Sequence, residues 1–446
     1  MIRHDAPPGR ARPLVYHERD AEPFQYFTEK TLDNIPQLQS LPESLRFDMR
    51  VVSSVLPFKV NAYVLNRLID WSDIPEDPMF QLTFPQRGML TEEHFGKMAD
   101  LHRAAAPREV IREQADRIRL ELNPHPAGQG TLNVPKLDGE ALPGMQHKYR
   151  ETVLFFPAAG QTCHAYCTFC FRWAQFVGMN ELRFAAKESA TLVKYLRRHP
   201  EVTNVLITGG DPMVMSTAKL ERYIEPLLDP SLEQLQSIRF GTKALAYWPQ
   251  RFVTDADADD LLRLFERIVA SGRSVAVMAH YSHYREMEPA IAREAIRRIR
   301  RTGAVIRSQS PVLAHVNDDA VSWELMWREQ VRLGIIPYYM FVERDTGAEQ
   351  YFRIPLARAY KIFRDAYRHV NGLARTVRGP SMSATPGKVE VMGVSDVAGE
   401  KVFALRFLQA RNAEWVGRPF FARYDAEATW LDHLRPAFGE ERFFWQ

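Results

Sequence analysis

Between residues 152 and 368, short β-rich runs alternate six times with helical runs, and this alternation limits the possible folds more than any other feature. The predicted strands are Thr152–Phe156, Asn204–Thr208, Ser237–Thr242, Ser274–Ala279, Ala304–Ser308 and Ile336–Val342. The predicted helices are Ala185–Arg198, Ala218–Leu228, Asp257–Ser271, Glu288–Arg301, Ala320–Leu333 and Pro355–Arg368. Strands joined in series by helices pair in parallel, and right-handed crossovers curl the sheet. The pattern predicts an α/β fold with a partial (β/α)6 barrel.

The N-terminal region, residues 1–150, is predicted to be mostly helical. Helical patterns cover Glu92–Ala106 and Pro107–Leu122. Several prolines interrupt Asp70–Gly88, which is therefore predicted to be an extended connector.

The barrel is predicted to occupy residues 151–371, and a C-terminal α+β extension the remaining residues 372–446. Hairpin-like runs at Val389–Val394 and Val402–Leu408 begin this extension, and an aromatic-rich tail follows them.

The overall charge excludes some classes of partner. The chain has 58 basic and 55 acidic residues, a net charge of +3, which predicts no nucleic-acid or membrane partner. No apolar run approaches the roughly 18 residues of a membrane span. Met1–Arg12 is polar and shows no secretory signal, so a cytoplasmic location is expected.

The three cysteines, Cys163, Cys167 and Cys170, lie within eight residues and directly follow the first predicted strand. Their C-x3-C-x2-C spacing favours an iron–sulfur cluster over a disulfide framework. A zinc knuckle and three incidental buried thiols are the alternatives. Structural zinc usually takes four ligands, and His164, adjacent to Cys163, is poorly placed to be the fourth.

The second predicted strand ends at Thr208-Gly209-Gly210-Asp211-Pro212. Two glycines allow a backbone to approach a ligand closely, although such a pair alone is often a plain turn. Together with the cysteines, this segment resembles the radical S-adenosylmethionine (SAM) proteins. The resemblance implies a [4Fe-4S] cluster whose open iron binds SAM, with the SAM amino group against Gly209, Gly210 and Asp211. Reduction of SAM would then yield a carbon radical.

A longer series of segments, from about Pro57 to Val394, resembles the lysine 2,3-aminomutase family, which combines SAM with pyridoxal 5′-phosphate (PLP). The matching segments are QLTFPQRGML (81–90), HKYRETVLFF (147–156), HYSHY (280–284), RSQSPVLAHVND (307–318), PYYMFVERD (337–345), QYFRIP (350–355) and TPGKVEV (385–391). The resemblance implies a 2,3-aminomutase that moves the α-amino group of a free amino acid to C3.

The same resemblance assigns roles to individual residues. Lys388 matches the lysine that binds PLP covalently, and Lys148 matches a contact to its phosphate. His280 and Gln309 match residues that contact SAM. Arg172 matches the arginine that binds the substrate carboxylate, a role suited to the guanidinium fork.

One departure concerns the phosphate site. A second phosphate arginine of the family falls on Thr152. If Lys148, Arg150 and Thr152 lie on one strand, their side chains share a face, and Arg150 is then predicted to supply the missing charge.

Another departure concerns the substrate. The two aspartates that bind the distal ammonium of lysine fall on Arg344 and Ser381. A cation at this place would disfavour lysine and favour an anionic amino acid such as glutamate. Two alternatives remain: a one-residue shift would place Asp345 in the site, and Arg344 could instead form a surface ion pair with Asp345 or Glu343.

The resemblance also implies an external electron donor, such as flavodoxin or ferredoxin, and a homo-oligomer. Rival interpretations are an enzyme acting on a lysine of a translation factor, a radical enzyme of this family with a different reaction, and a non-catalytic iron–sulfur binding or sensing protein.

Overall fold

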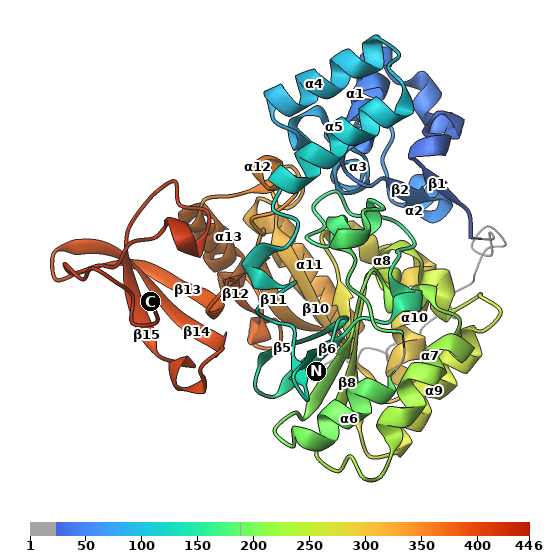
Figure 1. Cartoon of the computed structure of the whole chain (residues 1–446). Helices are drawn as coiled ribbons and strands as arrows, with labels where there is room; N and C mark the ends of the chain where they lie inside the picture. Colours follow the sequence, from blue (N-terminus) through green and yellow to red (C-terminus); the bar gives the residue numbers. More distant parts are fainter. Residues whose placement is uncertain (1–23, 188) are drawn as a thin grey trace, which may run out of the picture.

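A sheet of eleven strands runs through the computed structural model, which describes residues 24–187 and 189–446 (Figure 1). The strand order is β15-β14-β13-β12-β11-β10-β9-β8-β7-β6-β5. Helices flank this sheet, so the predicted α/β class is confirmed. The prediction for Met1–Arg12 lies outside the described residues.

The strands from β6 to β12 are parallel. They are β6 (Thr152–Phe155), β7 (Asn204–Ile207), β8 (Ser237–Thr242), β9 (Ser274–His280), β10 (Val305–Val312), β11 (Ile336–Val342) and β12 (Arg378–Ser383). The first six match the predicted strands, and β12 continues the parallel run beyond residue 371. The strand order is linear, but β5 (Met145–Tyr149) contacts β14 (Glu400–Ala410), so the sheet curves around an interior.

Helices follow the parallel strands near the predicted places. They are α6 (Ala190–Arg198), α7 (Thr217–Ile224), α9 (Ala258–Ala270), α10 (Ala290–Arg301), α11 (Ala320–Leu333) and α13 (Leu356–Arg368). In α9, Leu261, Leu264, Phe265 and Ile268 recur at helical spacing and are buried. The short helices α8 (Ala244–Tyr247) and α12 (Glu349–Phe352) lie in loops.

The N-terminal region is helical, as predicted, and its core is continuous with that of the parallel sheet. Its helices are α1 (Glu43–Ser53), α2 (Ala62–Arg67), α3 (Pro78–Thr83), α4 (Glu92–Arg103) and α5 (Arg108–Glu121), and its small sheets are β1 (Tyr26–Thr28) with β2 (Lys59–Asn61), and β3 (Lys136–Leu137) with β4 (Glu140–Ala141).

The prediction that Asp70–Gly88 is an extended connector is wrong, because α3 lies within it. Proline is favourable at the first position of a helix, where its missing N–H is not needed. Pro78 occupies that position, and the Asp77 carboxylate caps the amide of Phe80 at 2.8 Å.

The C-terminal extension has a hydrophobic core of its own. Its antiparallel strands are β13 (Gly387–Val397), β14 and β15 (Pro419–Arg423). The aromatic tail packs on them: the Trp445 ring lies 4.6 Å from that of Phe420. None of the helices described here is both long and apolar enough to cross a bilayer.

Candidate active site

A cavity of about 340 Å³ lies inside the curved sheet and contains most of the predicted site residues. The carboxyl ends of parallel strands meet at one edge of a sheet, so residues far apart in sequence converge there. The predicted residues that line the cavity are Cys163, Cys167, Cys170, Gly209, Gly210, Asp211, His280, Gln309, Lys148, Arg172, Arg344 and Lys388. Arg150 and Ser381 do not line it.

The cysteine loop, residues 161–170, is held by backbone carbonyls of the N-terminal region. The amide of Tyr166 donates to the carbonyl of Lys59 at 2.8 Å. The amide of Thr168 donates to the carbonyl of Leu82, in α3, at 3.0 Å. Helix α3 therefore helps to shape the loop that carries the three thiols.

The three thiols face the same cavity and influence one another electrostatically. Burial, the Asp211 carboxylate and the other two thiols raise the pKa of Cys163 above its usual value. Burial also raises the pKa of Cys167 to about 12 and that of Cys170 to about 11. Without a metal these thiols are protonated at neutral pH, and metal binding must release their protons.

Soft thiolates in one cavity fit an iron–sulfur cluster. Within residues 24–187 and 189–446, no three His, Cys, Asp or Glu side chains converge closely enough to share a single metal ion.

Both glycines of the 208–212 segment lie at the cavity wall, against the cysteine loop. A Cβ atom at Gly210 would lie 2.2 Å from the carbonyl oxygen of Thr162. Gly209 has a φ of +154°, which side chains rarely permit. These glycines allow the loop after β7 to pack directly on the cysteine loop, and they leave backbone exposed to a ligand.

The Asp211 carboxylate joins three segments of the site. It accepts from the Met213 amide (2.9 Å), the Thr242 hydroxyl (2.8 Å), the Lys243 amide (2.8 Å) and His164 Nε2 (3.1 Å). These four donors match the roughly four acceptor positions of a carboxylate. The Asp211 side chain therefore fixes the cysteine loop to the ends of β7 and β8.

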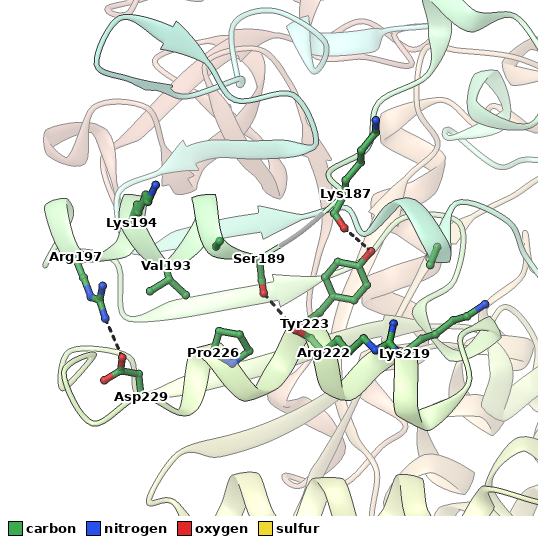
Figure 2. A pocket seen from close by; sticks show the side chains of 12 residues that line it. Lys187, Ser189, Val193, Lys194, Arg197, Lys219, Arg222, Tyr223, Pro226 and Asp229 are labelled. Carbon is green, nitrogen blue, oxygen red and sulfur yellow. Dashed lines mark hydrogen bonds and ion pairs between the residues drawn. The ribbon is translucent and has the colours of Figure 1, made fainter.

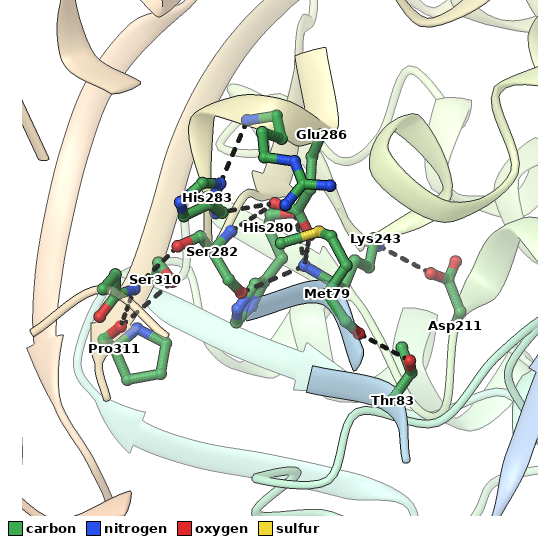
Figure 3. Close-up of polar contacts among 12 residues, drawn as sticks. Met79, Thr83, Asp211, Lys243, His280, Ser282, His283, Glu286, Ser310 and Pro311 are labelled. Carbon is green, nitrogen blue, oxygen red and sulfur yellow. Dashed lines mark hydrogen bonds and ion pairs between the residues drawn. The ribbon is translucent and has the colours of Figure 1, made fainter. Parts of the chain in front are cut away.

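A buried ion pair joins Lys243, in the cavity wall, to Glu286 behind it (Figure 3). Lys243 Nζ is 2.6 Å from Glu286 Oε1 and also donates to Ser282 Oγ at 3.2 Å. The other oxygen of Glu286 accepts from the amides of Ser282 (2.6 Å) and His283 (3.1 Å). This network orders the chain beyond β9, where His280 lies.

His280 and Gln309 are neighbours on β9 and β10, with a register irregularity at Gln309. His280 Nε2 is buried without a hydrogen-bond partner among the described residues. Burial, together with the charge of Lys243, lowers the pKa of His280 well below its usual value. A neutral imidazole with a free nitrogen fits the predicted contact to a polar ligand.

Lys388 is the second residue of β13 and lies beside Gln409 of β14. A Cβ atom at the preceding residue, Gly387, would lie 2.4 Å from the Gln409 carbonyl oxygen, so glycine is required there. The Lys388 ammonium lies 4.0 Å from the centre of the Tyr339 ring. Burial first, and then nearby cations led by Arg239, lower the pKa of Lys388 well below its usual value. A neutral amine is the form that attacks a carbonyl.

Two further cations of the cavity are suited to a phosphate. Lys148, whose pKa burial lowers to about 7, donates to the carbonyl of Ala384. Arg239 of β8 lines the cavity, and its Nε is buried without a partner among the described residues. An unpartnered buried guanidinium is costly unless an anion binds it. The residues present therefore fit a phosphorylated cofactor such as PLP.

The prediction that Arg150 shares a strand face with Lys148 and Thr152 is wrong. Strand β5 ends at Tyr149 and β6 begins at Thr152, so Arg150 lies in the turn between them. The Arg150 side chain is 64% exposed and pairs with Glu151 at 3.4 Å.

Two arginines face the cavity without a carboxylate partner. Arg172 is 7% exposed, and its Nε and Nη2 have no partner among the described residues. Burial first, and to a smaller extent the charge of Arg344, lower the pKa of Arg172 to about 10. Arg344 Nη2 donates to the Pro126 carbonyl at 3.3 Å, while its buried Nε is similarly without a partner. Each guanidinium is still a cation at neutral pH.

The structure decides between Arg344 and Asp345. Arg344 lines the cavity, and Asp345 does not. Asp345 Oδ2 instead accepts from Asn123 at 3.3 Å. In the described part of the chain, Arg344 forms no ion pair with Asp345 or Glu343 within 4 Å, so the predicted surface pair is absent there.

Ser381 does not support its predicted contact with substrate. It is fully buried in β12, between Phe341 of β11 and Glu390 of β13, and its hydroxyl is 3.5 Å from the Met340 carbonyl oxygen. Its short side chain does not reach the cavity, which Ser383 lines instead.

Arg239 and Lys243 also line the cavity, and neither was predicted from the sequence. Arg239 lies within β8, a predicted strand, and Lys243 directly follows its end. A charged residue directly after a parallel strand, as Lys243 is here and Asp211 is after β7, is a signal for a site.

Comparisons with known proteins place these features in context. No family model matches the chain. A protein of Aquifex aeolicus, provisionally named an L-lysine 2,3-aminomutase, is 30% identical over 90% of this chain and 94% of its own. The L-lysine 2,3-aminomutase of Bacillus subtilis is 24% identical over 78% of this chain and 63% of its own. That of Acetoanaerobium sticklandii is 27% identical over 60% of each chain.

Among solved structures, a radical SAM methyltransferase from Sphaerobacter thermophilus covers 60% of this chain and 89% of its own. The TM-score is 0.36 and the identity 15%, a similarity too low to establish a shared fold.

Proposed function

Because the chain belongs to the lysine 2,3-aminomutase family of radical SAM proteins, we propose that it is a PLP-dependent aminomutase acting on a free amino acid with an anionic side chain, such as glutamate. The reaction would move the α-amino group to C3. One observation carries the proposal: three thiols, a lysine with a depressed pKa and two guanidiniums without carboxylate partners line the same cavity.

The cofactors supply the reactive chemistry: bound to the cysteines, a [4Fe-4S] cluster with SAM provides a carbon radical, and PLP provides a carbonyl for the migrating nitrogen. Lys388 would hold PLP through its amine, whose pKa burial and nearby cations lower. Lys148 and Arg239 would bind the phosphate. The site residues line a cavity inside the curved sheet, and keeping bulk water from them would protect radicals from side reactions.

The substrate class follows from the two guanidiniums. Arg172 would bind the α-carboxylate, and Arg344 the side-chain carboxylate. Arg344 lies close enough to Arg172 for its charge to lower the pKa of Arg172. A lysine substrate would instead bring its ammonium toward Arg344, which costs several kcal/mol in a desolvated site.

Replacing Arg344 with aspartate is expected to raise the KM for glutamate by at least about 100-fold, since loss of a buried charge partner costs about 2–5 kcal/mol. The measurement uses reduced, reconstituted protein with SAM and PLP, and each amino acid in turn, with β-amino acid as the product detected. Arg344→Lys should retain part of the glutamate activity. If the unaltered chain forms β-lysine and no β-glutamate, the substrate assignment is wrong.

Replacing Arg239 with methionine is expected to weaken PLP binding by about 10–100-fold, because a hydrogen bond between charged groups contributes about 1.5–3 kcal/mol. Fluorescence titration of the apoprotein with PLP measures the change. Arg150→Met is the matched control and should bind PLP as the unaltered chain does. Equal losses in both variants, or a loss in Arg150→Met alone, would contradict the role given to Arg239.

A further inference from the structure

A basic groove of about 710 Å³ lies on the outside of the molecule, between α6 and α7 (Figure 2). Its walls carry Lys187, Lys194, Lys219 and Arg222, all of them exposed. None of these four side chains forms an ion pair with another residue that the structure describes. The molecule as a whole is nearly neutral, with a net charge of +3, so this concentration of positive charge is local.

Among the residues that the structure describes, the acidic groups near the groove are already paired. Asp229, at one end of the groove, binds Arg197 at 2.8 Å (Figure 2). Glu221 and Glu225 of the α7 segment bind Arg267 at 2.9 and 2.6 Å. The four lysine and arginine side chains of the groove therefore keep their positive field toward solvent.

The groove is close to the cysteine loop. Ala159, in its wall, precedes Cys163 by four residues, and four residues span at most about 14 Å. Gly160 accepts the amide of Gly210 at 3.0 Å, which links this wall to the glycine segment of the cavity. Tyr223, in the groove, packs its ring 5.8 Å from that of Phe155, at the end of the strand that leads into the loop.

Cleavage of SAM requires one electron from outside the site. The three cysteines of this chain can ligate one cluster only, so a second cluster cannot relay that electron within it. We infer that the basic groove between α6 and α7 is the docking surface for an acidic one-electron carrier protein. This inference rests on the proposed function. The carrier would lose one electron, and the cluster on Cys163, Cys167 and Cys170 would gain it.

Charge complementarity gives this docking its rate and its specificity. A positive groove attracts an acidic partner over about one Debye length, about 8 Å at physiological salt. Such steering raises association rates by roughly 10–10³-fold and weakens as salt increases. Rapid reduction by an acidic carrier should therefore depend on the groove and on ionic strength.

The test uses the reconstituted full chain and a reduced acidic flavodoxin as the probe. The groove variant is Lys194→Glu with Lys219→Glu. The matched control, Arg112→Glu with Arg117→Glu, reverses two exposed cations of α5 that likewise form no ion pair with a described residue. The electron paramagnetic resonance signal of the reduced cluster is followed with flavodoxin and, separately, with dithionite. Calorimetry measures flavodoxin binding directly.

We expect the groove variant to be reduced at least about 10-fold more slowly by flavodoxin at low salt, and to bind it correspondingly more weakly. Its reduction by dithionite should be unchanged, and the α5 variant should match the unaltered chain with both reductants. Equal flavodoxin rates in the two variants would overturn the inference, as would a groove that binds a DNA duplex more tightly than flavodoxin. If dithionite reduces the cluster but no β-amino acid forms, the proposed function fails while the docking result stands.

Discussion

Replacement of Cys167 with serine is expected to reduce formation of 5′-deoxyadenosine from SAM by more than about 100-fold, since even residues behind metal ligands contribute 10–100-fold to metal affinity. Cys167 is one of three thiols in the cavity, and its pKa of about 12 in the metal-free site means that only metal binding makes it a thiolate. A serine hydroxyl is a harder and less acidic ligand for iron.

Iron and sulfide content, measured after anaerobic reconstitution, should fall together with SAM cleavage. Arg150→Gln is a suitable control because Arg150 is exposed and outside the cavity. A Cys167→Ser protein that keeps four irons and cleaves SAM normally would show that this cysteine is not a cluster ligand. Zinc binding by the unaltered chain, without iron, would contradict the cluster itself.

Replacement of Lys388 with alanine is expected to lower aminomutase turnover by at least about 1000-fold, or over 4 kcal/mol of barrier. Burial and neighbouring cations lower the pKa of Lys388, which favours the amine form that attacks a carbonyl. The absorbance band of covalently bound PLP should disappear, while the iron content should not change.

The matched control is Lys401→Ala, on the neighbouring strand β14, which should keep both the PLP band and turnover. Reductive cleavage of SAM by the Lys388→Ala protein in the presence of dithionite should continue, because the cluster lies on a different segment. If the variant keeps the PLP band, another lysine holds the cofactor. If the unaltered chain shows no PLP band but cleaves SAM, the reaction belongs to a different radical chemistry.

The regular part of the fold was predictable from the sequence because apolar periodicity determines it. The limits of β8, β11 and α11 were predicted without error. Strand β12 was missed, since its sequence RGPSMS contains no run of β-branched residues and forms a strand only beside β11. Helix α3 was missed because the prolines of residues 70–88 were interpreted as breaks, whereas Pro78 begins the helix.

Site residues were predictable where the residues that act together are close neighbours in the sequence. The cysteine spacing and the glycine pair define their own loops, and these residues do line the cavity. Arg150 was misplaced because a two-residue turn after Tyr149 cannot be distinguished from a continuous strand by side-chain alternation. Arg239 was missed because its role depends on β8 and β13 facing the same cavity, where Arg239 lowers the pKa of Lys388, and this tertiary arrangement leaves no local pattern.

The hydrogen bonds from the cysteine loop to Lys59 and Leu82 mean that the N-terminal region must fold against the loop before a cluster can be assembled on it. Two amides of the loop find their acceptors outside the parallel sheet, on a segment made about 100 residues earlier. The thiols can therefore adopt their final positions only after that earlier segment has docked. If the N-terminal half is truncated or does not dock, we expect the chain to retain all three cysteines and yet fail to bind an iron–sulfur cluster.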